Sequence, residues 1–243
     1  MAPKRPDEIE HLTGRLSGEP RPRGISLLNG GVKFTPDGAV QRWPGNTFVC
    51  HINRTSMAFE AILELQEEMK KSVFNRFFTF LPPPSFHMTV YQGLSPDMKP
   101  GSGWPEGIPG GLSRDNVNAV FKERLEGLAL PSSFSIKVDG FFAGHSLTVS
   151  GANEDEERAL RQARVSLRDT TGLSFGDFDD YVFHITLAYL IDWMSEKTAR
   201  ELVDFSSGIS QRVLDQIGDI ELGPVEFSCF DSMHHFELLK LLS

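Results

Sequence analysis

The chain has 243 residues, of which 40% are hydrophobic, and it carries a formal net charge of −9. This length suits one large domain or two small lobes with a substantial buried core. Extended nucleic acids usually bind a basic face, so the acidic balance excludes them as expected partners and favours a small substrate or an RNA end. No apolar run approaches the ~20 residues that cross a bilayer, so no membrane role is expected.

The cysteines give no sign of a disulfide framework. Cys50 and Cys229 are the only two, and the paired Cys and His spacing of zinc sites is absent. The sequence also lacks a Gly-rich phosphate loop followed by Lys and Ser or Thr, and an apolar signal core at its start. We therefore expect a cytoplasmic or nucleocytoplasmic protein without a metal or cofactor, and we assume a monomer.

The first half of the chain predicts a flexible N-terminal arm over residues 1–24, followed by a single domain over 25–243. The arm is predicted because its residues are rich in charge, Pro and Gly. A strand over 48–52 and an amphipathic helix over 56–71 come next. The Gly- and Pro-rich segment 95–111 is long enough for a lid or rim, although a disordered insertion is the plainer interpretation.

The second half predicts further helices and strands in an order that resembles the first. Their apolar spacing and capping residues predict these elements: a helix capped by Ser113, strands over 134–142 and 146–149, a helix capped by Asn153 and ending near Gly172, a strand over 182–190, a helical stretch over 195–217 broken near Gly208, and strands over 220–230 and 233–239. The repeated order of helices and strands indicates two related lobes.

One short pattern, Phe-His-x-Thr followed by an apolar residue, occurs in both halves, at 86–90 and 183–187. Side chains alternate along a strand, so His87 and Thr89 share one face, as do His184 and Thr186. His-x-Thr also occurs at His11, but without the flanking apolar residues. We therefore set His11 aside and take the other two copies as a pair.

The two copies together favour a functional site over a structural one. A single copy is more simply explained as a buried strand histidine beside a strand-forming threonine. Two facing copies would present two imidazoles and two hydroxyls to one small anion, and histidine can act as acid or base near neutral pH. The pattern is thus suited to phosphate-ester chemistry without a metal.

With its two His-x-Thr strands, the chain resembles the 2H phosphoesterase superfamily. Residues 31–34, 37–38 and 44–47 also resemble a branch of that superfamily known only as a domain of unknown function. The resemblance implies a bilobal α+β fold with pseudo-two-fold symmetry, antiparallel sheets lining a central cleft and helices outside. It also implies catalytic roles for His87 and His184, and phosphate-binding roles for Thr89 and Thr186.

Tyr91 is a further candidate for substrate binding. Regular alternation places it on the same face as His87 and Thr89, where it would contact phosphate or stack on a base. An equally good alternative is that Tyr91 has no role in binding and simply places its hydroxyl at the rim of the site. The matching position in the second copy is Ala188, and alternation predicts that Tyr189 points to the core.

The sequence therefore predicts a metal-independent phosphoesterase that acts on a 2′,3′-cyclic phosphate of a nucleotide or RNA end. The two histidines would be general acid and base. A first alternative is an RNA ligase or end-processing enzyme, which the acidic composition disfavours. A second is a module that binds nucleotides or RNA ends without turnover, which the intact His and Thr of both copies disfavour.

Overall fold

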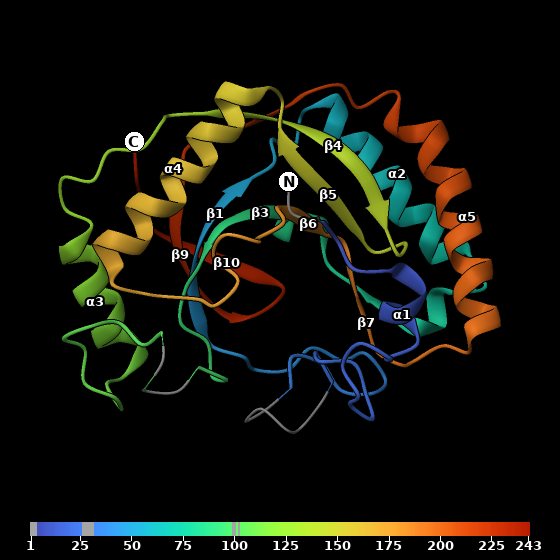
Figure 1. The fold of residues 1–243 in the computed structure, drawn as a ribbon, viewed down its shortest axis with the longest axis horizontal. Helices are drawn as coiled ribbons and strands as arrows, with labels where there is room; N and C mark the ends of the chain where they lie inside the picture. The colour runs from blue at the N-terminus through green and yellow to red at the C-terminus, as the bar shows by residue number, and fades with distance from the viewer. Residues whose placement is uncertain (1–3, 26–31, 99–100, 102) are drawn as a thin grey trace.

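A computed structural model describes residues 4–25, 32–98, 101 and 103–243 of the chain. Its main element is a strongly curved antiparallel sheet of eight strands (Figure 1). In sheet order the strands are β10 (His235–Leu241), β9 (Glu226–Ser232), β1 (Gly45–His51), β3 (His87–Gln92), β6 (His184–Thr186), β5 (Ser146–Gly151), β4 (Phe134–Phe142) and β8 (Ile220–Leu222). The two strands that carry the His-x-Thr motifs, β3 and β6, are neighbours at the centre.

The sheet confirms the predicted α+β fold with two related halves. β3 and β6 are each flanked by three further strands. In the first half α2 (Met57–Lys71) lies between β1 and β3 in the sequence, and in the second half α4 (Glu154–Thr171) lies between β5 and β6. The order strand, helix, motif strand thus occurs twice, although one continuous sheet spans both halves.

The long helices lie on the outside of the curved sheet (Figure 1). Ser113 caps α3 (Arg114–Arg124) and Asn153 caps α4, as predicted, because each side chain accepts a hydrogen bond from a backbone N–H of the first turn. α5 (Glu196–Leu214) runs through Gly208 without the predicted break, since one glycine costs a helix only about 1 kcal/mol. None of the helices in the described ranges is both long and apolar enough to cross a membrane.

The apolar residues of the motif strands form part of a core between the sheet and these helices. Met88 and Ile185 pair across β3 and β6, and both are fully buried. Burying side chains of this size contributes about 1.5–3 kcal/mol each. Because side chains alternate, this burial fixes which face of the sheet receives the histidines and threonines.

The second motif strand is shorter than predicted. Instead of one strand over 182–190, the structure has β6 and then β7 (Ala188–Leu190), which pairs with β2 (Phe78–Phe80) in a separate sheet. The break lies at Leu187. The backbone N–H groups of Leu187 and Ala188 both donate to the carbonyl oxygen of His145, at 2.9 and 3.2 Å, so the regular ladder cannot continue there.

Residues 4–25 do not form the loose arm that the sequence suggests. This segment, here called the N-terminal strap, contains α1 (Glu8–Leu12), which contacts α5. Leu12 is fully buried, and its carbonyl oxygen accepts a hydrogen bond from the Met194 N–H. The indole Nε1 of Trp193 donates to the carbonyl oxygen of Glu19 at 2.9 Å. These contacts with distant residues fix a segment whose composition alone indicates disorder.

Candidate active site

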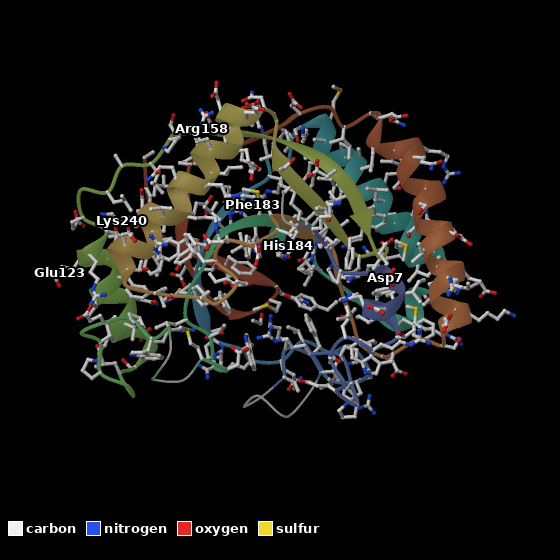
Figure 2. All side chains as sticks on the ribbon, viewed as in Figure 1. Asp7, Glu123, Arg158, Phe183, His184 and Lys240 are labelled. Carbon is white, nitrogen blue, oxygen red and sulfur yellow. The ribbon has the colours of Figure 1, made fainter. Side chains whose placement is uncertain are left out.

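Both motifs line one cavity of about 1000 Å³, here called the motif cavity. His87 and Thr89 reach it from β3, and His184 and Thr186 reach it from β6. Figure 2 shows His184 near the centre of the molecule. The cavity wall also contains six aromatic side chains: Trp43, Phe175, Tyr181, Tyr189, Phe230 and Phe236.

The pairing of β3 with β6 sets a crossed arrangement of the four motif residues. Since Met88 pairs with Ile185 in antiparallel register, His87 stands opposite Thr186 and Thr89 stands opposite His184. Each imidazole therefore has a hydroxyl beside it in its own strand and another across the pair. A tetrahedral phosphate between the strands would have imidazoles on two sides and hydroxyl donors on the others.

The two histidines are held by the same backbone contact. The Nδ1 atom of His87 is 2.7 Å from the carbonyl oxygen of Ser85, and that of His184 is 2.8 Å from the carbonyl oxygen of Val182. A carbonyl only accepts hydrogen bonds, so Nδ1 carries the proton in both rings. Nε2 is therefore the nitrogen that takes up or releases a proton in each ring.

Burial keeps the imidazoles of His87 and His184 neutral near neutral pH. Burial, with smaller contributions from the neighbouring imidazoles of His51 and His184, lowers the pKa of His87 to about 3, although the hydrogen bond to the Ser85 carbonyl opposes this shift. Burial, together with the charges of Arg5 and Lys33, lowers the pKa of His184 to about 4, although the hydrogen bond to the Val182 carbonyl opposes this shift. An anion bound between the rings would raise both pKa values because opposite charge favours the protonated form.

The surroundings of the first histidine contain a second histidine and a carboxylate. His51, which pairs with His87 across β1 and β3, has its Nδ1 3.0 Å from Oε2 of Glu226. The Phe236 ring meets the His87 ring edge-on, with centroids 4.3 Å apart. The groups that contact His87 in the structure are thus aromatic rings and a histidine that is paired with a carboxylate.

The surroundings of the second histidine are more cationic. Lys33 lines the cavity, and Arg5 donates to Thr148, which pairs with His184 across β5 and β6. The Tyr181 ring lies 5.9 Å from the His184 ring, and its hydroxyl donates to the Thr89 carbonyl oxygen at 3.4 Å. Tyr181 is a cavity residue that the sequence did not single out, because it lies in a loop before the motif.

Tyr91 does not line the motif cavity, although regular alternation predicts it on the same face as His87 and Thr89. It is fully buried, and its hydroxyl donates to the Leu173 carbonyl oxygen at 2.7 Å. The register between β1 and β3 shifts so that Val90 is an extra residue: Val49 pairs with Thr89 but Phe48 pairs with Tyr91. This bulge turns Tyr91 away from the face of His87.

The second motif strand shows the corresponding effect. Because regular pairing breaks at Leu187, Tyr189 lines the cavity, whereas alternation predicted a place in the core. In the first strand Gln92 is the matching residue beyond the bulge, and it also lines the cavity. No local sequence signal marks either irregularity, since Val90 and Leu187 are ordinary strand residues.

Part of the predicted rim segment 95–111 does border the motif cavity. Ser95, Asp97 and Met98 line it, while residues 99, 100 and 102 lie outside the described part of the chain. Further along, the indole of Trp104 donates to the Ile108 carbonyl oxygen at 2.7 Å. The described residues of the segment therefore have defined contacts rather than the plainer disordered arrangement.

Residues 33–147 match a family model named 2H-phosphodiest and described as "Domain of unknown function (DUF1868)". The predicted 2H resemblance is confirmed. This match includes the first motif and supports a phosphoesterase-type function at the level of the 2H superfamily. The second motif lies beyond the matched residues, so its relation to the first comes from the structure.

A solved structure has the same fold over nearly the whole chain. The conserved protein of unknown function ATU0111 from Agrobacterium tumefaciens is similar with a TM-score of 0.89 and 24% sequence identity. The alignment covers 98% of this chain and 100% of that one. At this identity the likeness establishes the fold alone. A comparison with curated proteins finds no match.

Proposed function

We propose that the protein is a metal-independent phosphoesterase that hydrolyses a 2′,3′-cyclic phosphate of a nucleotide or an RNA end. The observation that carries this proposal is the matched pair of histidines. Both have Nδ1 bonded to the carbonyl two residues earlier, and both line one cavity with Thr89 and Thr186. The aromatic residues of the cavity wall suit a nucleobase, which favours a nucleotide over a small phosphate ester.

The proposed reaction needs one proton acceptor and one proton donor. A neutral imidazole takes a proton from water as the water oxygen bonds to phosphorus. The bond from phosphorus to one ribose oxygen breaks, and the second imidazole, protonated when the anion binds, gives its proton to that oxygen. The hydroxyls of Thr89 and Thr186 donate to the nonbridging oxygens as negative charge builds on them.

Proton transfer by the two histidines does not require a bound metal ion. Among the residues that the structure describes, no group of three or more His, Cys, Asp or Glu side chains could hold a metal ion. The proposal assigns both proton transfers to the imidazoles of His87 and His184, which line the cavity. Activity in the presence of EDTA is its direct consequence.

The test is turnover of a panel of 2′,3′-cyclic nucleotides in EDTA, with wild type and His87→Ala compared. We expect activity in the wild type and its loss in the variant, and the position of the product phosphate identifies the ribose oxygen that leaves. Activity that needs added metal, or that persists in His87→Ala, would contradict the proposed mechanism. Ligand binding without turnover in the wild type would instead support a binding module.

The threonines allow a finer test. Thr89→Val and Thr186→Val keep the shape of the side chain but remove the hydroxyl donor. A hydrogen bond to a charged group is worth about 1.5–3 kcal/mol, so we expect each change to lower kcat/KM at least about tenfold. Unchanged kcat/KM in either variant would remove that threonine from the proposed phosphate site.

A further inference from the structure

Arg5 of the N-terminal strap is bound to two hydroxyls next to the second motif. Its Nη2 donates to Ser146 Oγ at 3.0 Å, and its Nε donates to Thr148 Oγ1 at 3.3 Å. The guanidinium carbon lies 4.8 Å from the centroid of the Phe142 ring. The strap thus places a cation against strand β5, although the two are far apart in the sequence.

The register of the sheet places this cation beside the proposed reaction centre. Ser146 pairs with Thr186, and Thr148 pairs with His184. Paired residues of neighbouring strands point to the same face, so Arg5 lies on the face that carries His184. The charge of Arg5 also acts on the pKa of Tyr181, which like His184 lines the motif cavity.

Arg5 lines a second cavity, of about 1330 Å³, rather than the motif cavity itself. Consecutive residues before β6 divide between the two: Tyr181 and His184 line the motif cavity, whereas Val182 and Phe183 line the second. Thr148, which Arg5 contacts in this second cavity, pairs with His184 of the motif cavity, and the charge of Arg5 acts on the pKa of His184. A substrate with its reacting phosphate at His184 can therefore extend a second group toward Arg5.

No carboxylate neutralises Arg5 within the described residues. Two of the three other strap arginines do pair with a carboxylate: Arg15 with Glu196, and Arg23 with Asp97. Burial lowers the pKa of Arg5, which reflects the cost of removing this cation from water. A half-buried guanidinium whose hydrogen bonds go to two hydroxyls has donors left for an anion, which it would bind strongly.

We propose that Arg5 binds a second anionic group of the substrate, so that the preferred substrate is a nucleotide with another phosphate besides the cyclic one. This inference rests on the proposed function. It makes the strap part of substrate selection. Arg5 binds an anionic group that does not react. Arg5 and His184 together then set the position of the nucleotide.

The kinetic test compares two substrates, a nucleoside 2′,3′-cyclic phosphate and the same compound with an added 5′-phosphate. We expect the wild type to prefer the second, and Arg5→Met to reduce the ratio of the two kcat/KM values by about tenfold to a hundredfold. Arg15→Met is the matched control, since Arg15 lies on the same strap but pairs with Glu196, and it should keep the ratio. A purely structural role for Arg5 would lower both kcat/KM values equally, and an unchanged ratio would overturn the proposal.

A binding test separates this inference from the proposed activity. Calorimetric titration with a nucleoside 2′-phosphate and a nucleoside 2′,5′-bisphosphate needs no turnover. If no cyclic substrate is hydrolysed but the bisphosphate binds more tightly and only Arg5→Met removes the difference, the activity is wrong and the Arg5 site stands. If the wild type binds neither ligand, or binds both equally, the Arg5 site is wrong.

Discussion

The two motif strands share a backbone arrangement but differ in the charges around them. In both, the histidine Nδ1 is bonded to the carbonyl two residues earlier, and an irregularity directly after the threonine turns a later side chain into the cavity. Around His87 lie neutral rings and the His51–Glu226 pair, whereas Arg5 and Lys33 act on His184. The backbone therefore makes the two imidazoles geometric equivalents, and the side chains make them electrostatically distinct.

The largest expected effect is the loss of kcat when one of the two equivalent histidines is removed. His87→Ala and His184→Ala should each lower kcat by about 10²–10⁴, because each removes a group that transfers a proton. His235→Ala, on the exposed face of β10, serves as the control and should have full activity. Steady-state kinetics of the three variants, with circular dichroism to confirm folding, makes the comparison. Near-normal kcat in either motif variant would show that the two histidines do not act as a pair.

The next largest effect is a loss of stability, and it concerns the irregularities in strand pairing that follow the two motifs. Arg164 is 1% exposed and donates from Nη1 to the carbonyl oxygen of Val90, the extra residue of the first bulge, at 2.7 Å. Its guanidinium also lies 4.0 Å from the centroid of the Tyr181 ring. At the second irregularity a backbone carbonyl, that of His145, accepts two N–H groups instead. A side chain thus stabilises the first irregularity and the backbone stabilises the second.

We therefore expect Arg164→Met to destabilise the protein by about 2–3 kcal/mol, since it leaves a buried carbonyl without its charged donor. Arg158→Met is the control on the same helix, because Arg158 is exposed and pairs with Asp155 of the same exposed surface. Urea unfolding of both variants measures the difference. Equal stability of the two variants would mean that the Arg164 contact contributes nothing net to the fold.

These irregularities also explain how far the sequence predicts the molecule. Capping residues such as Ser113 and Asn153, and the faces of His87 and His184, follow from local patterns and were predicted correctly. Tyr91 was placed wrongly, because strict alternation fails after a bulge whose partners are distant in sequence. The strap was missed for the same reason, since its contacts lie with residues far along the chain.

A smaller effect is expected on the pH dependence of stability, because two histidines hold the strap beside the second motif. Nε2 of His11 lies 3.2 Å from Nε2 of His145, so one ring donates and the other must accept. Burial, with Arg5 nearby, lowers the pKa of His11 to about 4 and lowers that of His145 as well. Both rings are therefore neutral in the folded protein, whereas in the unfolded chain they bind protons near pH 6.5.

Stability should consequently be full above about pH 6.5 and fall as the pH drops toward 4, because only the unfolded state takes up these protons in that range. Because the pKa of His11 falls from 6.5 to about 4 on folding, each pH unit below 6.5 should cost up to about 1.4 kcal/mol from this residue. His11→Gln should give a flatter dependence over the same range. Denaturant unfolding at several pH values measures it, and an identical slope in the variant would exclude His11 as a source.

The smallest expected effects are those of replacing Tyr91 and Tyr189. For these two residues the structure reverses the faces that alternation predicts. Tyr91→Phe removes the donor to the Leu173 carbonyl oxygen, so it should cost about 1 kcal/mol in stability and leave KM unchanged. Tyr189→Leu removes an aromatic ring from the cavity wall and should raise KM for a nucleotide, because a stacked base loses its partner. If KM instead rises in Tyr91→Phe and not in Tyr189→Leu, the substrate contacts the face that regular alternation predicts. The bulges would then not set which side chains reach the substrate.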